Sequence, residues 1–261
     1  MFNRKFLFAT FRYWLVKFAK YRANTLFSFF GELAVPICIN VMFLIGLNDS
    51  NAEFLEIKYV LEYIVLANIV FTISITGIEE VISADIKSAT LIYKLTEPTS
   101  PCVSYILYDI ANKSIRILMF YFPTIIILAA LGWITINGNL AIAFVFLILA
   151  NIIGYSLSFI IGSLSFWITE TWGISSVKNL LFAVAAGAVF PFSILPEILR
   201  TIILCTPFPY LGYVPSEILL NAPSDNIVKM LFIAVIWCVI LVCIAVVVWK
   251  CGKKKYESVG V

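Results

Sequence analysis

The chain has 261 residues, of which 62% are hydrophobic and only 13% charged, with a formal net charge of +3. Soluble domains hold about 45–50% apolar and about 25% charged residues, so this composition excludes a soluble protein. The apolar residues form blocks of about 20, long enough to cross about 30 Å of hydrocarbon. We therefore expect an all-α integral membrane protein, with one membrane domain over residues 1–261.

Several kinds of site are missing from the sequence. There is no histidine, which removes the usual general base and the commonest metal ligand. Six cysteines are scattered without a Cys-x-x-Cys pair, so neither a zinc site nor a redox pair is indicated. No Gly-x4-Gly-Lys-Ser/Thr loop occurs. We expect no enzyme activity, metal or cofactor in this chain, and no nucleic-acid partner.

The N-terminal residues 2–22 carry six basic residues and no acidic one. At helical spacing their apolar residues form one continuous stripe, with most of the bases on the other side. This pattern predicts an amphipathic helix lying on an anionic membrane surface. A plain basic leader before the first span is the alternative. The stripe comprises Leu7, Phe8, Phe11, Trp14, Leu15, Phe18 and Tyr21.

Six membrane spans follow within residues 24–250, before a short tail at 251–261. We expect them near residues 24–47, 58–78, 116–134, 140–168, 174–190 and 226–250. With the N-terminus in the cytoplasm, 15 of the 18 lysines and arginines fall on the cytoplasmic side. This bias predicts that both termini are cytoplasmic. The long connection 79–115 is then cytoplasmic, and the connection 191–225 is extracytoplasmic.

Polar residues inside the predicted spans are candidates for a substrate pathway, because hydrocarbon tolerates them only with partners or beside a cavity. Asn68, Thr72 and Thr76 share one face of the second span, and Asn40 lies in the first. Hydrogen bonding between helices would explain them equally well. Glu32, also in the first span, is either a functional acid or a carboxylate paired with a base of the N-terminal helix.

Small residues recur every four positions in the span 140–168, at Gly154, Ser158 and Gly162. Such spacing allows two helices to approach closely. We expect this face to serve helix packing. The partner helix could belong to this chain or to another.

The connection 79–115 begins with the acidic and apolar sequence EEVISADIKSATLIYKLTEPTSP. It predicts a short helix that ends before Pro98 and Pro101 and exposes an amphipathic cytoplasmic surface. This surface suits the docking of a partner protein, and a solvated connector is the alternative. The candidate docking residues are Asp85, Ile86, Lys87 and Leu91.

The stretch PFSILPEILRTIILCTPFPY, residues 191–210, is apolar but holds four prolines. Pro196 is well placed to start a short helix near 196–205, and a second short helix follows near residue 215. We expect a re-entrant helical hairpin between spans five and six, acting as an external gate. An amphipathic loop on the outer surface is the alternative. The candidate gate residues are Pro191, Pro196, Glu197, Arg200 and Pro207.

These features together resemble a known family. The basic N-terminal helix, the six spans and the segment AAGAVFPFSILPEILRTIILCTPFPYLGYVPSEILLN look like the permease subunit of type-2 (ABC-2 type) ABC exporters. ADIKSATLIYKLTEPTSP is similar to the cytoplasmic segment of a bacterial branch of that family. Two positions depart from that branch: Ala89 stands where glycine is usual, and Glu97 replaces an arginine.

The resemblance implies a mechanism and partners. Two permeases, identical or different, would pair in the bacterial cytoplasmic (inner) membrane, each docked on an ATPase subunit through a cytoplasmic coupling helix. ATP and Mg would bind to that ATPase, and an amphipathic or hydrophobic substrate (drug, peptide or lipid-like) would leave by alternating access at the interface of the permease dimer. The alternatives are a secondary transporter driven by an ion gradient and a membrane assembly subunit without transport.

Overall fold

The computed structural model describes residues 4–20, 26–27, 30–31, 38, 54–97, 99–130, 132, 138–168, 172–192, 195–220 and 226–258. This part of the chain contains helices and turns and no strand. Four of its helical segments are long and apolar enough to cross a membrane: Tyr59–Lys87, Pro101–Ala130, Leu140–Phe166 and Ile227–Tyr256. The expectation of an all-α membrane protein is confirmed. The predicted span 24–47 lies almost entirely outside the described residues.

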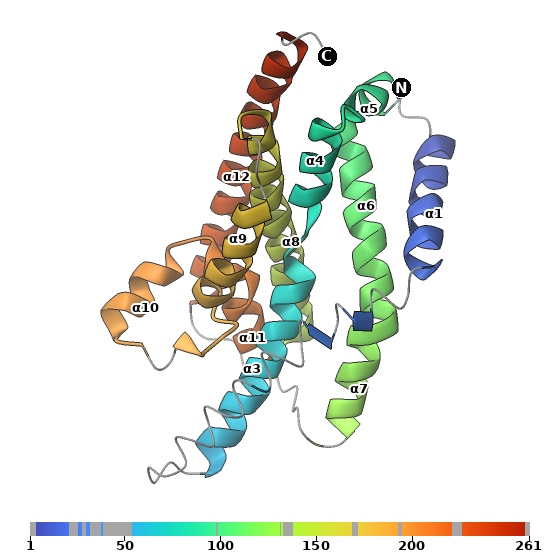
Figure 1. Cartoon of the computed structure of the whole chain (residues 1–261). Helices are drawn as coiled ribbons and strands as arrows, with labels where there is room; N and C mark the ends of the chain where they lie inside the picture. Colours follow the sequence, from blue (N-terminus) through green and yellow to red (C-terminus); the bar gives the residue numbers. More distant parts are fainter. Residues whose placement is uncertain are drawn as a thin grey trace.

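Helix α1 (Arg4–Lys20) runs beside α6 (Pro101–Arg116), as Figure 1 shows. The rings of Trp14 and Phe18 meet the ring of Tyr108 edge to face, at centroid distances of 4.8 and 5.2 Å. The predicted N-terminal helix is therefore present, and part of its apolar stripe packs on a neighbouring helix. Arg12 and Lys17 lie on the exposed side.

The second predicted span extends well beyond residue 78. Helix α3 (Phe54–Ser74) is followed, after a short break, by α4 (Ile78–Lys87), which continues along the same direction in Figure 1. Ile78, Ile82 and Ile86 of α4 are buried, and α4 packs against α8. The predicted connection 79–115 therefore begins with a helix whose apolar face is covered by α8, so the alternative of a solvated connector does not fit α4.

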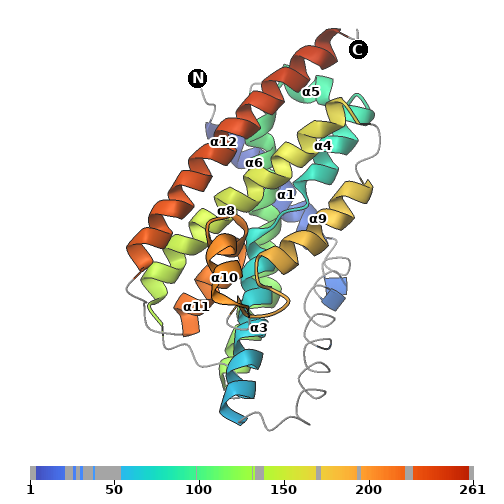
Figure 2. The ribbon, with the colours of Figure 1, turned by 90° about the vertical axis from the view of Figure 1, so that its left-hand side faces the viewer.

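The third predicted span also begins earlier than expected, at Pro101 rather than near residue 116. Helices α6, η1 (Ile117–Tyr121) and α7 (Phe122–Ala130) form one continuous segment, in which η1 is a π-helical turn. Pro101 occupies the first turn of α6, where its missing N–H costs nothing. The short helix α5 (Leu91–Thr96) connects α4 to this segment, and it lies at the same end of the bundle as the C-terminal end of α12 (Figures 1 and 2).

Helix α8 (Leu140–Ser163), extended by the 3-10 turn η2 (Leu164–Phe166), packs along α12 (Ile227–Ser258), as Figure 2 shows. Its small residues face the chain between α3 and α4. A Cβ at Gly154 would lie 2.2 Å from the carbonyl oxygen of Ser74, and one at Gly162 would lie 2.9 Å from Cα of Glu79. The predicted packing face is confirmed, and its partner belongs to the same chain.

The fifth apolar helix is short: α9 spans Trp172–Ala185, and its apolar segment Gly173–Ala185 falls below the length of the four long ones. Two short helices follow at about the predicted positions, α10 (Glu197–Leu204) and α11 (Tyr213–Leu220), separated by the 3-10 turn η4 (Phe208–Leu211). Helix α11 is mostly buried and packs on α3 and α8, whereas α10 has no buried residue. Figure 2 shows α10 at the near side of the bundle.

Candidate functional site

A polar pocket of about 330 Å³ lies between α3, α6 and α9, at the level where α3 gives way to α4. Three residues predicted to line a substrate pathway, Asn68, Thr72 and Thr76, all belong to its wall. The other lining residues are Phe71, Ile75, Gly77, Asp109, Asn112, Lys113, Arg116, Asn179 and Ala183. The pocket therefore collects polar side chains from segments more than 100 residues apart in the sequence.

The α3 wall of this pocket is fixed by hydrogen bonds. Asn68 Nδ2 donates to the carbonyl oxygens of Ile64 and Ala188, both at 2.8 Å. Thr72 Oγ1 donates to the carbonyl oxygen of Asn68 at 2.7 Å. Bonding between segments, one of the two interpretations of Asn68, is thus observed, and the same side chain also lines the cavity. The two interpretations are compatible.

The α6 wall carries an ion pair between Asp109 and Lys113, whose Oδ2 and Nζ atoms are 3.0 Å apart. Lys113 Nζ also donates to Oδ1 of Asn151 at 2.8 Å. The two side chains keep 9% and 12% of their surface exposed, because they border the pocket. An i,i+4 pair of this kind supports a helix and also places charge at the cavity wall.

A second ion pair is sealed beside the pocket. Lys178 Nζ of α9 lies 2.5 Å from Oε1 of Glu79 on α4, and the two side chains are 2% and 1% exposed. The ammonium group also donates to the Thr76 carbonyl and to Ser158 Oγ, both at 3.1 Å. Ser158 Oγ in turn donates to the Thr76 carbonyl at 3.0 Å. This cluster joins α9 and α8 to the break between α3 and α4.

Sequence reasoning missed this second pair. Glu79 was expected at the start of the cytoplasmic connection 79–115, and Lys178 was counted among the basic residues on the cytoplasmic side. The available signal was the unusual position of Lys178 inside a predicted apolar span, since a basic residue there needs a partner. Its acidic partner is 99 positions away, so spacing could not identify it.

The predicted coupling residues lie at the end of α4 and the start of α5, on both sides of the turn between these helices, and most of them face inward. Asp85 binds Nζ of Lys94 at 2.5 Å and accepts a hydrogen bond from the Tyr105 hydroxyl at 2.8 Å. Ile86 and Leu91 are buried. Of the four predicted residues only Lys87 is classed as exposed, and other exposed side chains of this turn are Ser88, Thr90, Tyr93, Thr96 and Glu97.

The backbone of this turn is left-handed at Ala89, one of the two positions that depart from the resemblance. Ala89 follows α4 with a φ of +58°, in the left-handed region that side chains with a Cβ disfavour. The resembling bacterial branch has glycine at this position, which fits that conformation. The main-chain N–H of Ser88 still donates to the Ala84 carbonyl at 2.9 Å, so the helix end is hydrogen-bonded in the usual way.

The irregular segment after α9 is buried, and three successive carbonyl oxygens in it each accept a hydrogen bond. Ala186 accepts from the Tyr213 N–H at 2.8 Å, Gly187 from the Tyr63 hydroxyl at 2.7 Å, and Ala188 from Asn68. Gly187 has a φ of +73°, and a Cβ there would lie 2.9 Å from the Tyr63 hydroxyl. Non-helical backbone at membrane depth requires such partners.

The predicted gate residues are distributed over α10 and its flanks. Pro196 immediately precedes α10 and Glu197 is its first residue, whereas Pro191 and Pro207 are buried. Arg200 Nη2 donates to the Tyr213 hydroxyl at 3.0 Å. Burial raises the pKa of the Tyr213 hydroxyl above its ordinary value, and the carboxylate of Glu217 raises it further.

Arg200 therefore links α10 to α11, and none of the five predicted gate residues lines the polar pocket. Glu32 and Asn40, the remaining predicted pathway residues, lie outside the described residues. Within the part of the chain that the structure describes, no three potential metal ligands cluster together.

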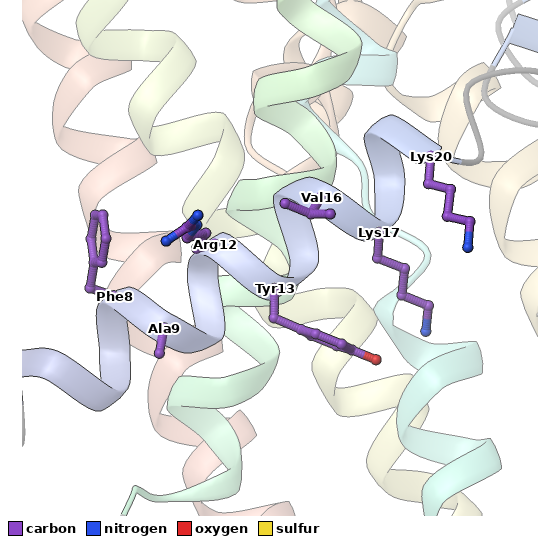
Figure 3. A pocket seen from close by; sticks show the side chains of 7 residues that line it. All are labelled: Phe8, Ala9, Arg12, Tyr13, Val16, Lys17 and Lys20. Atoms are coloured by element: carbon purple, nitrogen blue, oxygen red, sulfur yellow. The ribbon is translucent and has the colours of Figure 1, made fainter.

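A second hollow, of about 600 Å³, is bordered by one face of α1 (Figure 3). Its wall includes Phe8, Arg12 and Lys17, and Figure 3 shows these side chains projecting from the same helix. Lys17 Nζ lies 4.6 Å from the centre of the Trp14 ring, a cation–π distance. The described residues of this wall all belong to α1.

Comparison with known proteins identifies the chain over most of its length. Residues 33–260 match a family model described as "ABC-2 family transporter protein". A comparison with curated proteins found no match. The family comprises transporter membrane components that lack an ATPase domain, in agreement with the absence of a phosphate-binding loop from the sequence. The matched range and the long apolar helices together show that the chain belongs to the ABC-2 family of transporter membrane proteins.

Proposed function

We propose that the chain is the permease subunit of an ATP-driven ABC exporter that moves an amphipathic or hydrophobic substrate out of the cytoplasm. The observation that carries the proposal is the family match over residues 33–260 in a chain without a phosphate-binding loop. The energy for transport then comes from a separate ATPase subunit that binds ATP and Mg. A second permease, identical or homologous, completes the transporter in the bacterial cytoplasmic membrane, with both termini in the cytoplasm.

The turn between α4 and α5 is the proposed docking surface for the ATPase. Its exposed residues include Lys87, Thr90 and Tyr93, the last with 74% of its surface exposed. Asp85 braces the turn from inside by binding Lys94 and Tyr105 of the next two helices. A push on the turn would therefore move α4 and α6 together.

The polar pocket is proposed to form part of the substrate pathway. It is lined by α3, α6 and α9; α3 leads to the docking surface through α4, and α6 follows α5. Asn68, Thr72 and Thr76 would contact substrate, together with Glu32 and Asn40 of the first span. The helices α10 and α11 are the proposed external lid, and the bond from Arg200 to Tyr213 holds them together.

Co-purification tests the proposal. The tagged chain is expressed with the ATPase encoded beside it and extracted in mild detergent, and recovery of a nucleotide-binding subunit is expected. Tyr93→Ala should reduce that recovery, whereas Tyr13→Ala, at another exposed tyrosine on α1, should leave it unchanged. The proposal fails if the wild-type chain brings down no ATPase.

A secondary transporter is the second candidate, favoured by the charged pair Glu79–Lys178 buried between a candidate span and the shorter apolar helix α9. Uptake of a substrate on a proton or sodium gradient, without ATP, would support it over the exporter.

A further inference from the structure

We propose that the break between α3 and α4 forms a site of the kind that binds alkali cations, and that the ammonium group of Lys178 occupies this site in place of a free ion. The proposal goes beyond the proposed function, because it concerns how the broken helix is held and which ions can act there. It depends neither on the identity of the substrate nor on the ATPase.

The groups around the ammonium form a typical set of ligands for a hard cation. They are a carboxylate oxygen of Glu79 at 2.5 Å, the Thr76 carbonyl at 3.1 Å and the Ser158 hydroxyl at 3.1 Å. Hard cations in proteins are bound by such oxygens. The second oxygen of Glu79 is buried, and no group in the described part of the chain donates to it. A metal cation in place of the ammonium would find a fourth oxygen there.

The position in the fold is also that of a cation site. Helix α3 ends at Ser74 and α4 begins at Ile78, so the Thr76 carbonyl lies in unwound backbone inside a segment long enough to span a membrane. Unwound carbonyls of discontinuous helices coordinate sodium in secondary transporters. Here the same carbonyl accepts hydrogen bonds from Lys178 and Ser158.

The cation is covalently attached to α9, 102 residues after Thr76 in the sequence. It neutralises Glu79 and satisfies the broken backbone without any ion from solution. The site therefore holds no exchangeable ion in the wild-type chain. It should not make the stability of the chain or its transport depend on sodium or potassium. Asn179, the residue after Lys178, lines the polar pocket, so the bonds made by Lys178 also hold the α9 wall of the pocket in place.

Removal of the ammonium should expose the site to free cations. The purified Lys178→Ala variant is melted in NaCl, KCl and choline chloride at equal ionic strength, beside the wild type. The wild-type Tm should be the same in the three salts. The variant should melt lowest in choline chloride and should rise by at least about 3 °C, saturably, in NaCl or KCl, because an ion that binds only the folded state stabilises it.

The double variant Glu79→Gln/Lys178→Ala is the matched control, since it lacks the carboxylate and should show no such rise. An equal Tm of Lys178→Ala in all three salts would overturn the proposal, and so would an equal rise in the double variant. If Lys178→Ala is recovered as monodisperse protein only when prepared in sodium or potassium, the proposal is supported. If it is recovered in none of the salts, the proposal is wrong. Both readouts use the chain alone, so they are independent of ATPase binding.

Discussion

The two ion pairs beside the polar pocket contrast in construction. Glu79 and Lys178 come from different helices, are 1–2% exposed and are covered by α8. Asp109 and Lys113 lie one turn apart on α6 and keep about a tenth of their surface open to the cavity. A charge that is fully removed from water is strongly destabilising without its opposite charge, whereas a charge at a cavity wall can still interact with other groups there. The comparison suggests that the first pair holds the fold and the second serves the pocket.

The sealed pair should give the largest effect when one partner is removed. Lys178→Met leaves the Glu79 carboxylate buried without its cation, and we expect a loss of about 3–5 kcal/mol of stability. Thermal melting in detergent and recovery of monodisperse protein measure it. The control Glu79→Leu/Lys178→Met removes both charges and should recover most of the loss. Equal damage in the double variant would show that the charges do not depend on each other.

Each of the two glycines of α8 lies beside a different one of the two regions compared, so substituting them one at a time tests the two regions separately. Gly154→Ala would place a methyl group 2.2 Å from the Ser74 carbonyl beside the pocket, and Gly162→Ala would place one 2.9 Å from Cα of Glu79. We expect both to be destabilising, by about 1–3 kcal/mol or more, with Gly154→Ala the worse because its methyl group would meet backbone at the shorter distance. Thermal melting of both variants provides the ranking. The reverse order would contradict the packing described for α8.

The pair at the cavity wall should behave differently. Asp109→Asn keeps the shape of the side chain, and Lys113 retains its bond to Asn151, so the expected loss of stability is only about 1 kcal/mol. Transport should fall much more than stability, since charge at the pocket wall changes. Melting and substrate transport are measured on the same preparation. A large loss of stability with normal transport per folded molecule would reverse the roles assigned to the two pairs.

The smallest effect is expected at Ala89, outside both pairs. Ala89→Gly removes the cost of a left-handed alanine but adds freedom to the unfolded chain, so we expect a gain of about 0.5–1 kcal/mol. Thermal melting against Ala84→Gly, at an exposed position within helix α4 where a loss is expected, checks the sign. A loss of stability in Ala89→Gly would contradict the turn geometry.

The sequence predicted some of this architecture well, because the signals were local. The apolar block 140–168, the glycine spacing at Gly154 and Gly162, and the helix start at Pro196 each depend on neighbouring residues. The extent of the second and third spans was not predictable in the same way. Glu79 and Asp85 were assigned to the cytoplasmic connection 79–115, and it is the distant Lys178 that explains how α4 buries Glu79.

The polar pocket shows the same limit. Asn68, Thr72 and Thr76 were identifiable from one helical face, since their spacing is local. Their neighbours across the cavity, such as Asp109 and Asn179, belong to segments whose approach depends on the packing of three helices. Sequence periodicity gives the face of a helix but not what lies opposite.

Transport by the reconstituted complex tests the central claim most directly. The chain, its ATPase and any second permease are placed in inverted vesicles, and the accumulation of a fluorescent amphiphile is followed with ionophores dissipating all ion gradients. The account predicts accumulation that requires ATP and Mg, stops when the ATPase is inactivated, and is the same in sodium and choline buffers. Accumulation driven by an imposed proton or sodium gradient without ATP would contradict it.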